Sequence, residues 1–143
     1  MKKFACLYVL LCAITVHSQT VRFKVSYTIG GDDNLKSESV SYVERELRSL
    51  GDVDILPKNG FYKLSLLVMP LQKNNYQSGF VISSVVSWRN ACSTNVIDTY
   101  PCYVLEDHTL FTGYDLKETM SRVVTDFDIH SLAPLRKGDI FKP

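Results

Sequence analysis

Two long runs in the middle of the chain alternate apolar and polar residues with a period of two. The first spans 61–69 and the second 80–89, and both are rich in β-branched and aromatic residues. Such alternation is typical of strands that bury one face. The link from Leu71 to Gly79 follows Pro70 and carries two asparagines, so it predicts a turn. We therefore expect residues 61–88 to form the central hairpin of a sheet.

The residues before this hairpin predict a strand, a helix and a second, short strand. Residues 21–29 alternate in the same way, and a Gly-Gly-Asp-Asp turn at 30–33 follows them. Asp32 or Asp33 is placed to cap a helix. The apolar residues of that helix recur at spacings of three and four, and they are Val40, Val43, Leu47 and Leu50. An Asp-Val-Asp-Ile-Leu stretch at 52–56 then predicts the short strand.

The carboxyl-terminal third predicts one more strand and a second amphipathic helix. Residues 102–112 form the expected strand, with a bulge or turn at 106–108. Asp115 is placed to cap the helix, whose apolar stripe consists of Leu116, Met120, Val123, Val124 and Phe127. Pro134 and Gly138 predict the end of order, which leaves 134–143 as a surface tail.

The order strand, helix, four strands, helix defines an α+β domain. We expect a four- to five-stranded mixed or antiparallel sheet with both helices packed on one face. Because strand–helix–strand crossovers are right-handed, the first strand should lie parallel to a neighbour near the hairpin. This element order resembles that of small envelope modules such as the amino-terminal domain of the TolB type. The resemblance lies in element order alone, so it implies a fold and no function.

The first residues have the pattern of a secretory signal peptide. Two lysines precede an apolar run from Phe4 to Val16, and Ser18 supplies a small residue for cleavage. The run is shorter than the roughly 20 residues that a transmembrane helix needs. We expect cleavage after Ser18, with Thr15 as the alternative site, a single domain at 19–133 without a transmembrane segment, and a periplasmic or secreted location.

The cysteines agree with export. Cys6 and Cys12 leave with the signal peptide, and Cys92 and Cys102 remain. An oxidising compartment favours a disulfide between these two. A redox or zinc-binding pair is disfavoured, because the spacing is not Cys-x-x-Cys and no histidine lies between them.

Charge narrows the class of partner. Without the two signal-peptide lysines the chain has 14 basic and 15 acidic residues, a net charge of −1. Nucleic-acid binding rests on phosphate neutralisation by an excess of basic residues. A nearly neutral domain is therefore expected to bind no nucleic acid.

Signatures of catalysis are weak. His108 and His130 are the histidines that follow the signal peptide, and a hydrolase would pair one of them with an acid and with a strand serine. The candidate serines are Ser83, Ser84 and Ser87. The chain has no Gly-x-Ser-x-Gly motif. We expect no enzyme and no cofactor.

Asp126 and His130 are the candidate metal ligands. If the last helix reaches them, they lie one turn apart on the same side, where they would supply two ligands to a divalent ion. The same spacing also suits an ion pair near the end of a helix. Both interpretations stay open at this point.

The sheet face away from the helices is the candidate binding surface. It is expected to be basic and rich in hydroxyls, with Arg22, Lys24, Ser26, Lys63, Ser65, Ser83, Ser87 and Arg89. Leu67, Met69, Val81 and Val85 would form an apolar island there, rimmed by the cations. Trp88 is a candidate anchor, because tryptophan and arginine dominate binding hot spots. The predicted binding residues are Arg22, Lys24, Lys63, Trp88 and Arg89.

The sequence thus predicts an exported, non-catalytic binding or accessory domain of an envelope system, with an envelope protein or polymer as its partner. One alternative is a small hydrolase or metal-dependent enzyme that uses His108, His130 and nearby acids. The other is a structural subunit that forms a homo-oligomer through an open sheet edge.

Overall fold

The computed structural model describes residues 21–73, 76–91 and 101–138. Its elements are β1 (Phe23–Gly31), α1 (Asp33–Ser49), β2 (Val53–Ile55), β3 (Tyr62–Lys73), β4 (Tyr76–Ala91), β5 (Pro101–Gly113), α2 (Leu116–Phe127), the π-helix η1 (Asp128–Leu132) and α3 (Ala133–Arg136). No helix within these ranges is long and apolar enough to cross a membrane. The expected signal peptide and Cys92 lie outside the described residues, so cleavage and the disulfide to Cys102 stay predictions.

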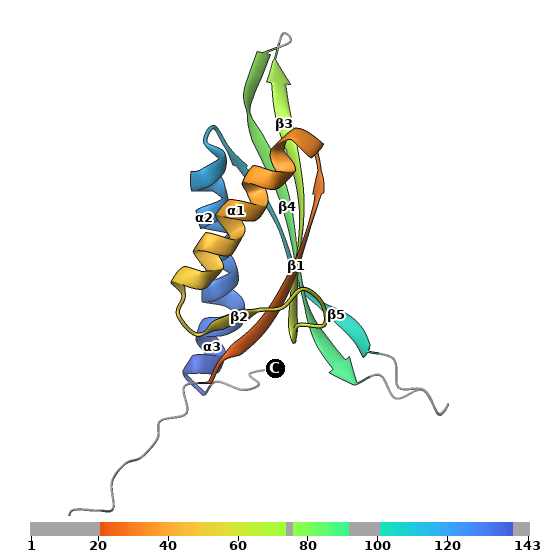
Figure 1. The fold of residues 1–143 in the computed structure, drawn as a ribbon, viewed down its shortest axis with the longest axis vertical. Helices are drawn as coiled ribbons and strands as arrows, with labels where there is room; N and C mark the ends of the chain where they lie inside the picture. The colour runs from red at the N-terminus through yellow and green to blue at the C-terminus, as the bar shows by residue number, and fades with distance from the viewer. Residues whose placement is uncertain (1–20, 74–75, 92–100, 139–143) are drawn as a thin grey trace, which may run out of the picture.

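A five-stranded sheet and a layer of helices on one of its faces make up the fold (Figure 1). The strand order is β2-β1-β3-β4-β5, with β1 parallel to both β2 and β3. The β3–β4 and β4–β5 pairs are antiparallel. The predicted α+β class, element order and one-sided helix layer are confirmed, and so is a first strand parallel to its neighbour.

Helix α1 begins at the predicted cap. The Asp32 carboxylate accepts a hydrogen bond from the Asn34 N–H at 2.9 Å, which satisfies one of the unpaired donors of the first turn. Arg48 donates to Glu44 at 2.9 Å, the favourable order for a pair four residues apart. Glu44 also accepts a 2.6 Å hydrogen bond from the Tyr27 hydroxyl of β1. This carboxylate therefore links α1 to the sheet.

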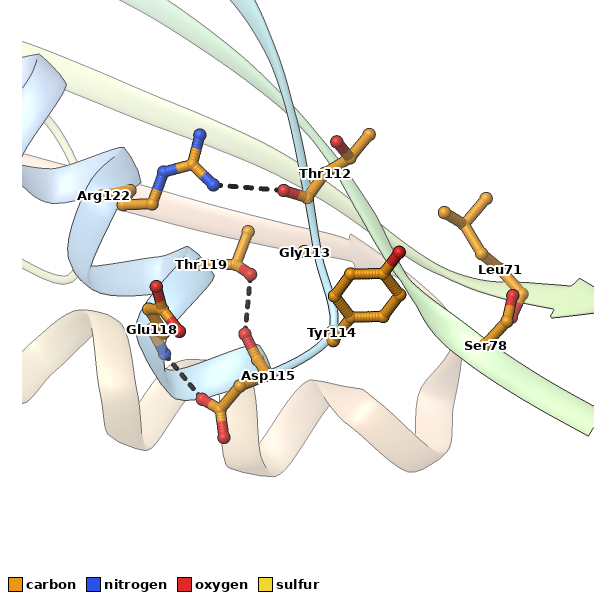
Figure 2. A pocket seen from close by; sticks show the side chains of 9 residues that line it. All are labelled: Leu71, Ser78, Thr112, Gly113, Tyr114, Asp115, Glu118, Thr119 and Arg122. Atoms are coloured by element: carbon orange, nitrogen blue, oxygen red, sulfur yellow. Dashed lines mark hydrogen bonds between the residues drawn. The ribbon is translucent and has the colours of Figure 1, made fainter.

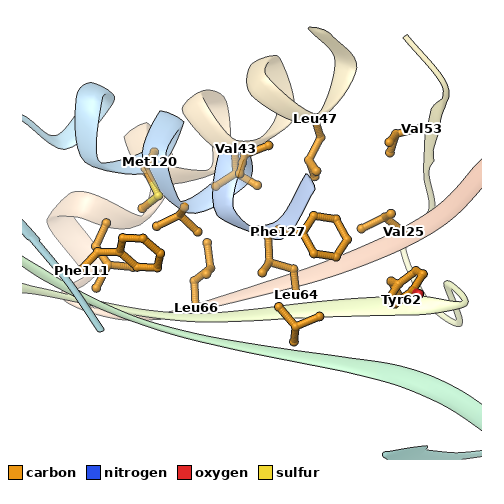
Figure 3. Packing of buried hydrophobic residues seen from close by; sticks show 14 of the residues in the cluster. Val25, Val43, Leu47, Val53, Tyr62, Leu64, Leu66, Phe111, Met120 and Phe127 are labelled. Atoms are coloured by element: carbon orange, nitrogen blue, oxygen red, sulfur yellow. The ribbon is translucent and has the colours of Figure 1, made fainter. Parts of the chain in front are cut away.

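The hydrophobic core lies between the sheet and the helices (Figure 3). The sheet contributes Val25, Leu64 and Ile82, and the helices contribute Leu47, Met120 and Phe127, all fully buried. The Tyr62 ring meets the Phe127 ring edge-on at 5.7 Å between centroids. The apolar stripes of both helices are thus used on a single face of the sheet, and the other face is left without them.

The central hairpin is longer than predicted. Most of the expected turn at 71–79 belongs to the strands, whose pairing continues to Lys73 and Tyr76. Pro70 does not interrupt β3, although proline removes a ladder donor. The pairing of β1 with β3 ends at Val68. The backbone nitrogen of Pro70 points to the same side of β3 as that of Val68, the side on which β1 lies. The missing N–H of Pro70 therefore points where no described strand needs it.

Strand β5 carries the predicted bulge. Val86 pairs with Asp107 and Ser87 pairs with Leu105, so Glu106 is the extra residue. The bulge lies on a strand at the edge of the sheet, where such irregularities are common.

The carboxyl-terminal helical segment extends beyond its predicted end. Residues 134–136, assigned from the sequence to a surface tail, form α3. Pro134 fits there because the first turn of a helix has no hydrogen-bond partner for the N–H that proline lacks. Arg136 then forms ion pairs with Asp52 and Asp128, which hold this segment on the domain.

Candidate functional site

The sheet face opposite the helices carries no described helix or strand (Figure 1). We call it the open face. The strand registers align its residues in rows across β1, β3 and β4, because alternate side chains of a strand point to the same side. On β3 and β4 its residues are Lys63, Ser65, Leu67, Met69, Val81, Ser83, Val85, Ser87 and Arg89.

Three cations from three strands lie at one end of the open face. Lys24, Lys63 and Arg89, here called the cationic end, have no carboxylate within ion-pair distance among the described residues. The Lys63 ammonium lies 5.8 Å from the centroid of the Tyr103 ring, a cation–π contact. The Tyr103 hydroxyl donates to the Gly60 carbonyl at 3.1 Å, which fixes that ring on the face. This end can bind anionic groups.

Arg22 and Trp88, the remaining predicted binding residues, do not add free cations or an anchor to the cationic end. Arg22 forms a 2.8 Å ion pair with Asp54 of β2, so its charge is already neutralised. Trp88 alternates with the open-face residues of β4 and is half-buried against the core. Its ring centroid lies 6.4 Å from that of Phe61. The structure thus brings together three of the five predicted residues.

The other end of the open face is apolar. Leu67 and Met69 of β3 are 47% and 49% exposed, and Leu110 of β5 is 64% exposed. Leu67, Ser83 and Leu110 form one row across three strands, and Met69 pairs with half-buried Val81 in the next. We call Leu67, Met69, Val81 and Leu110 the apolar end. Exposed leucine and methionine side chains grouped on one surface are typical of a binding site.

Three residues of this surface could not be assigned to a face from the sequence pattern: Tyr103, Leu105 and Leu110. Leu105 is 62% exposed and pairs with Ser87, in the row of Lys63. The strict alternation around buried Phe111 places its neighbour Leu110 on the opposite side. For Tyr103, the bulge reverses the alternation between it and Phe111, so the register with β4 was needed.

In the row of Leu67 and Leu110, Ser83 forms a hydrogen-bonded pair with His108. The Ser83 hydroxyl lies 3.0 Å from Nε2 of the imidazole. A serine hydrolase also requires an acid that orients the histidine. Asp107 accepts from the backbone N–H of His108, and no carboxylate bonds the imidazole among the residues described. The pair is therefore a polar bridge between β4 and β5.

Asp126 and His130 contact each other and belong to no larger ligand set among the described residues. Nδ1 of His130 lies 3.2 Å from a carboxylate oxygen of Asp126 and 3.0 Å from its carbonyl oxygen. Within the described ranges, no group of three or more His, Cys, Asp or Glu side chains could hold a metal ion. His130 borders a shallow hollow with Asp107 on the helix side of β5, whereas His108 points to the open face. The two histidines of the enzyme alternative are thus on opposite sides of the sheet.

A hollow of about 590 Å³ lies where β5 leads into α2 (Figure 2). Its polar groups already have structural roles. Asp115 accepts from the Glu118 N–H at 2.7 Å as the helix cap, and Arg122 donates to the Thr112 carbonyl at 3.1 Å. Tyr114, 91% exposed, forms its outer wall. Asp115 and Arg122 of this hollow are thus used in structural hydrogen bonds.

Comparisons with known proteins identify no family for this chain. No protein-family model matches the chain, and no curated protein matches it either. Among solved structures, the chain is similar to a dodecamer of a PelC variant from Paraburkholderia phytofirmans, with 17% sequence identity and a TM-score of 0.43. The similarity covers 75% of this chain and 84% of that one.

Proposed function

We propose that this protein is an exported, periplasmic, non-catalytic binding domain that serves as an accessory component of an envelope system and binds through its open face. Export is inferred from the lysines, the apolar run and the small residue at the start of the chain. The observation that carries the proposal is a sheet face that combines grouped, exposed leucine and methionine side chains with cations that have no ion pair among the described residues.

Two features support binding over catalysis. The polar groups that resemble catalytic sets are incomplete: Ser83 and His108 lack an acid, and Asp126 and His130 lack further ligands among the described residues. The open face, by contrast, offers both kinds of side chain that interfaces use, apolar residues and charged residues beside them.

A capture experiment with charge-reversed variants tests the proposal. The protein is recovered gently from the cell that exports it, and its native mass is compared with that of K24E/K63E/R89E. The wild type should carry a stoichiometric partner, and the triple variant should not. The control is K36E/K117E, which reverses two exposed cations of α1 and α2 outside the open face.

Two further variants separate this proposal from the enzyme alternative. H108A and H130A should leave partner capture unchanged. A partner that is retained by K24E/K63E/R89E but lost in either histidine variant would contradict binding through the open face. A bare wild-type mass in every preparation would contradict the proposal as well.

A further inference from the structure

A partner that is complementary to the open face needs two kinds of side chain. Its cationic end needs carboxylates, because Lys24, Lys63 and Arg89 have none within ion-pair distance in the described part of the chain. Asp54 lies opposite Lys24 across the β1–β2 pair, and its carboxylate is paired with Arg22. Its apolar end needs apolar groups. Lys63 and Met69 are separated by six positions along β3, which corresponds to about 20 Å.

We infer that the partner is a protein segment with acidic side chains at one end and apolar side chains about 20 Å away along the strand direction. This inference rests on the proposed function, because it specifies what the open face binds. A polypeptide reaches this spacing with about six extended residues or about 13 helical ones. An anionic polysaccharide would satisfy the cations and leave the apolar end in water.

A second copy of this chain does not match the face. Two open faces packed with their strands parallel would place Lys63 and Arg89 against the same residues of the other copy. With the strands antiparallel, the cationic end of each copy would lie on the apolar end of the other. Both arrangements bury cations without partners, which disfavours them.

The edges of the sheet also disfavour pairing with a strand of a second copy. On β5, Arg122 occupies the Thr112 carbonyl at 3.1 Å, and Asp107 accepts from the His108 N–H at 2.7 Å. The bulge at Glu106 interrupts the regular backbone of β5 between Leu105 and Asp107. Bulges and side chains that occupy edge groups prevent strand addition. The opposite edge, β2, has three residues.

A peptide-display selection tests the inference. Random peptides of about 14 residues are long enough to span 20 Å even as a helix. They are selected on the purified wild-type protein. The enriched peptides are then measured against L67S/M69S/L110S and against K24Q/K63Q/R89Q. The controls are I129S, which changes an exposed apolar residue outside the open face, and K36E/K117E. A polyuronate and anionic phospholipid vesicles are measured beside the peptides.

The expected result is enrichment of peptides with an acidic block and an apolar block. Their affinity should fall about tenfold or more in each triple variant and stay within about twofold of wild type in the controls. Because the altered side chains are exposed, apart from half-buried Lys63, unchanged melting curves should show that all variants fold.

The failures can be told apart. Purely acidic peptides that bind L67S/M69S/L110S as well as wild type would overturn the inference and leave the proposed function standing. So would binding of only the polyuronate or the vesicles in a manner that depends on Lys63. A dimer abolished by L67S/M69S/L110S would overturn it in favour of a second copy. If none of the probes distinguishes K24Q/K63Q/R89Q from wild type, both the inference and the proposed function fail.

Discussion

Arg136 donates two hydrogen bonds to the carboxylate of Asp52, which lies 84 positions earlier in the chain. Nε donates to one carboxylate oxygen, and Nη2 donates to the other at 2.8 Å. The guanidinium carbon also lies 5.5 Å from the Phe23 ring centroid, and Nη1 forms a 2.6 Å ion pair with Asp128. One side chain thus joins the last helix to the beginning of β2 and to β1.

Replacing this arginine should destabilise the domain more than replacing an ordinary surface arginine. R136A removes a bidentate, partly buried contact and should lower the free energy of unfolding by about 1–3 kcal/mol. Urea unfolding followed by circular dichroism measures the change. R45A is the matched control, because Arg45 pairs with Glu46 on the surface of α1, and its loss should cost less than about 1 kcal/mol. Equal losses in the two variants would contradict the anchoring role of Arg136.

The same contact should make stability depend on acid. The hydrogen bond from Arg136 is the main cause that lowers the pKa of Asp52 in the folded protein. A carboxyl group with a lowered pKa stabilises the folded state above its unfolded pKa of about 3.9, and that contribution is lost as the pH falls through the folded pKa. Wild type should therefore lose its advantage over R136A below about pH 4. Urea unfolding of both proteins across the acidic range checks this, and a constant difference would contradict it.

Two tyrosines should make the domain sensitive to base. Burial raises the pKa of Tyr27 to about 12, with a further contribution from the hydrogen bond to Glu44, and burial also raises the pKa of Tyr62 to about 12. Because the folded state holds these protons more tightly, stability is complete below about pH 10 and falls between about pH 10 and 12. Y27F should reduce this alkaline loss and should cost about 1 kcal/mol at neutral pH through the lost hydrogen bond. Phenolate absorbance and unfolding measured together provide the test.

Gly31 should tolerate no side chain. Its φ is +110°, and a Cβ there would lie 1.9 Å from the Val68 carbonyl oxygen. G31A must therefore move the backbone where β1 meets β3, and it should cost more than about 2 kcal/mol. Gly51 also has a positive φ, of +79°, but open space around it. G51A should cost about 1 kcal/mol from strain alone, so thermal unfolding of the two variants separates collision from strain.

Divalent metals should leave the protein unaffected. Asp126 and His130 supply two ligands, and no third lies with them in the described part of the chain. Two protein ligands do not make a stable zinc site. The melting temperature should therefore stay constant when zinc is added in excess or removed with a chelator. A rise with zinc that disappears in H130A would contradict this expectation.

The element order and the faces of the sheet could be predicted because each segment has a clear period and a clear boundary. Val25 and Leu64 each lie between polar residues and became part of the core, as their alternation predicts. Pro70 could not be placed, because whether a proline fits a strand depends on where the neighbouring strand ends. The fate of Pro134 likewise depended on Arg136 finding Asp52, a contact that no local pattern reveals.

The candidate surface was predicted in part for the same reason. Lys24, Lys63 and Arg89 lie on the open face because each occupies a position of its strand whose side chain points to that side. Arg22 occupies such a position as well and is nevertheless paired with Asp54, which depends on the parallel pairing of β1 with β2. Trp88 alternates with such positions, so its inclusion followed from residue type alone.

The number of residues in the π-helical turn between α2 and α3 determines the direction in which Arg136 points. A π-helix closes its hydrogen bonds one residue later than an α-helix does, as the Ala133 N–H does to the Asp128 carbonyl. Each helical residue turns the chain by about 100°. Deleting one residue from this turn would therefore rotate Arg136 by that angle, away from Asp52. Substitutions at exposed Ile129 leave this phase intact, so relatives of this chain should vary there in residue type before they vary in length.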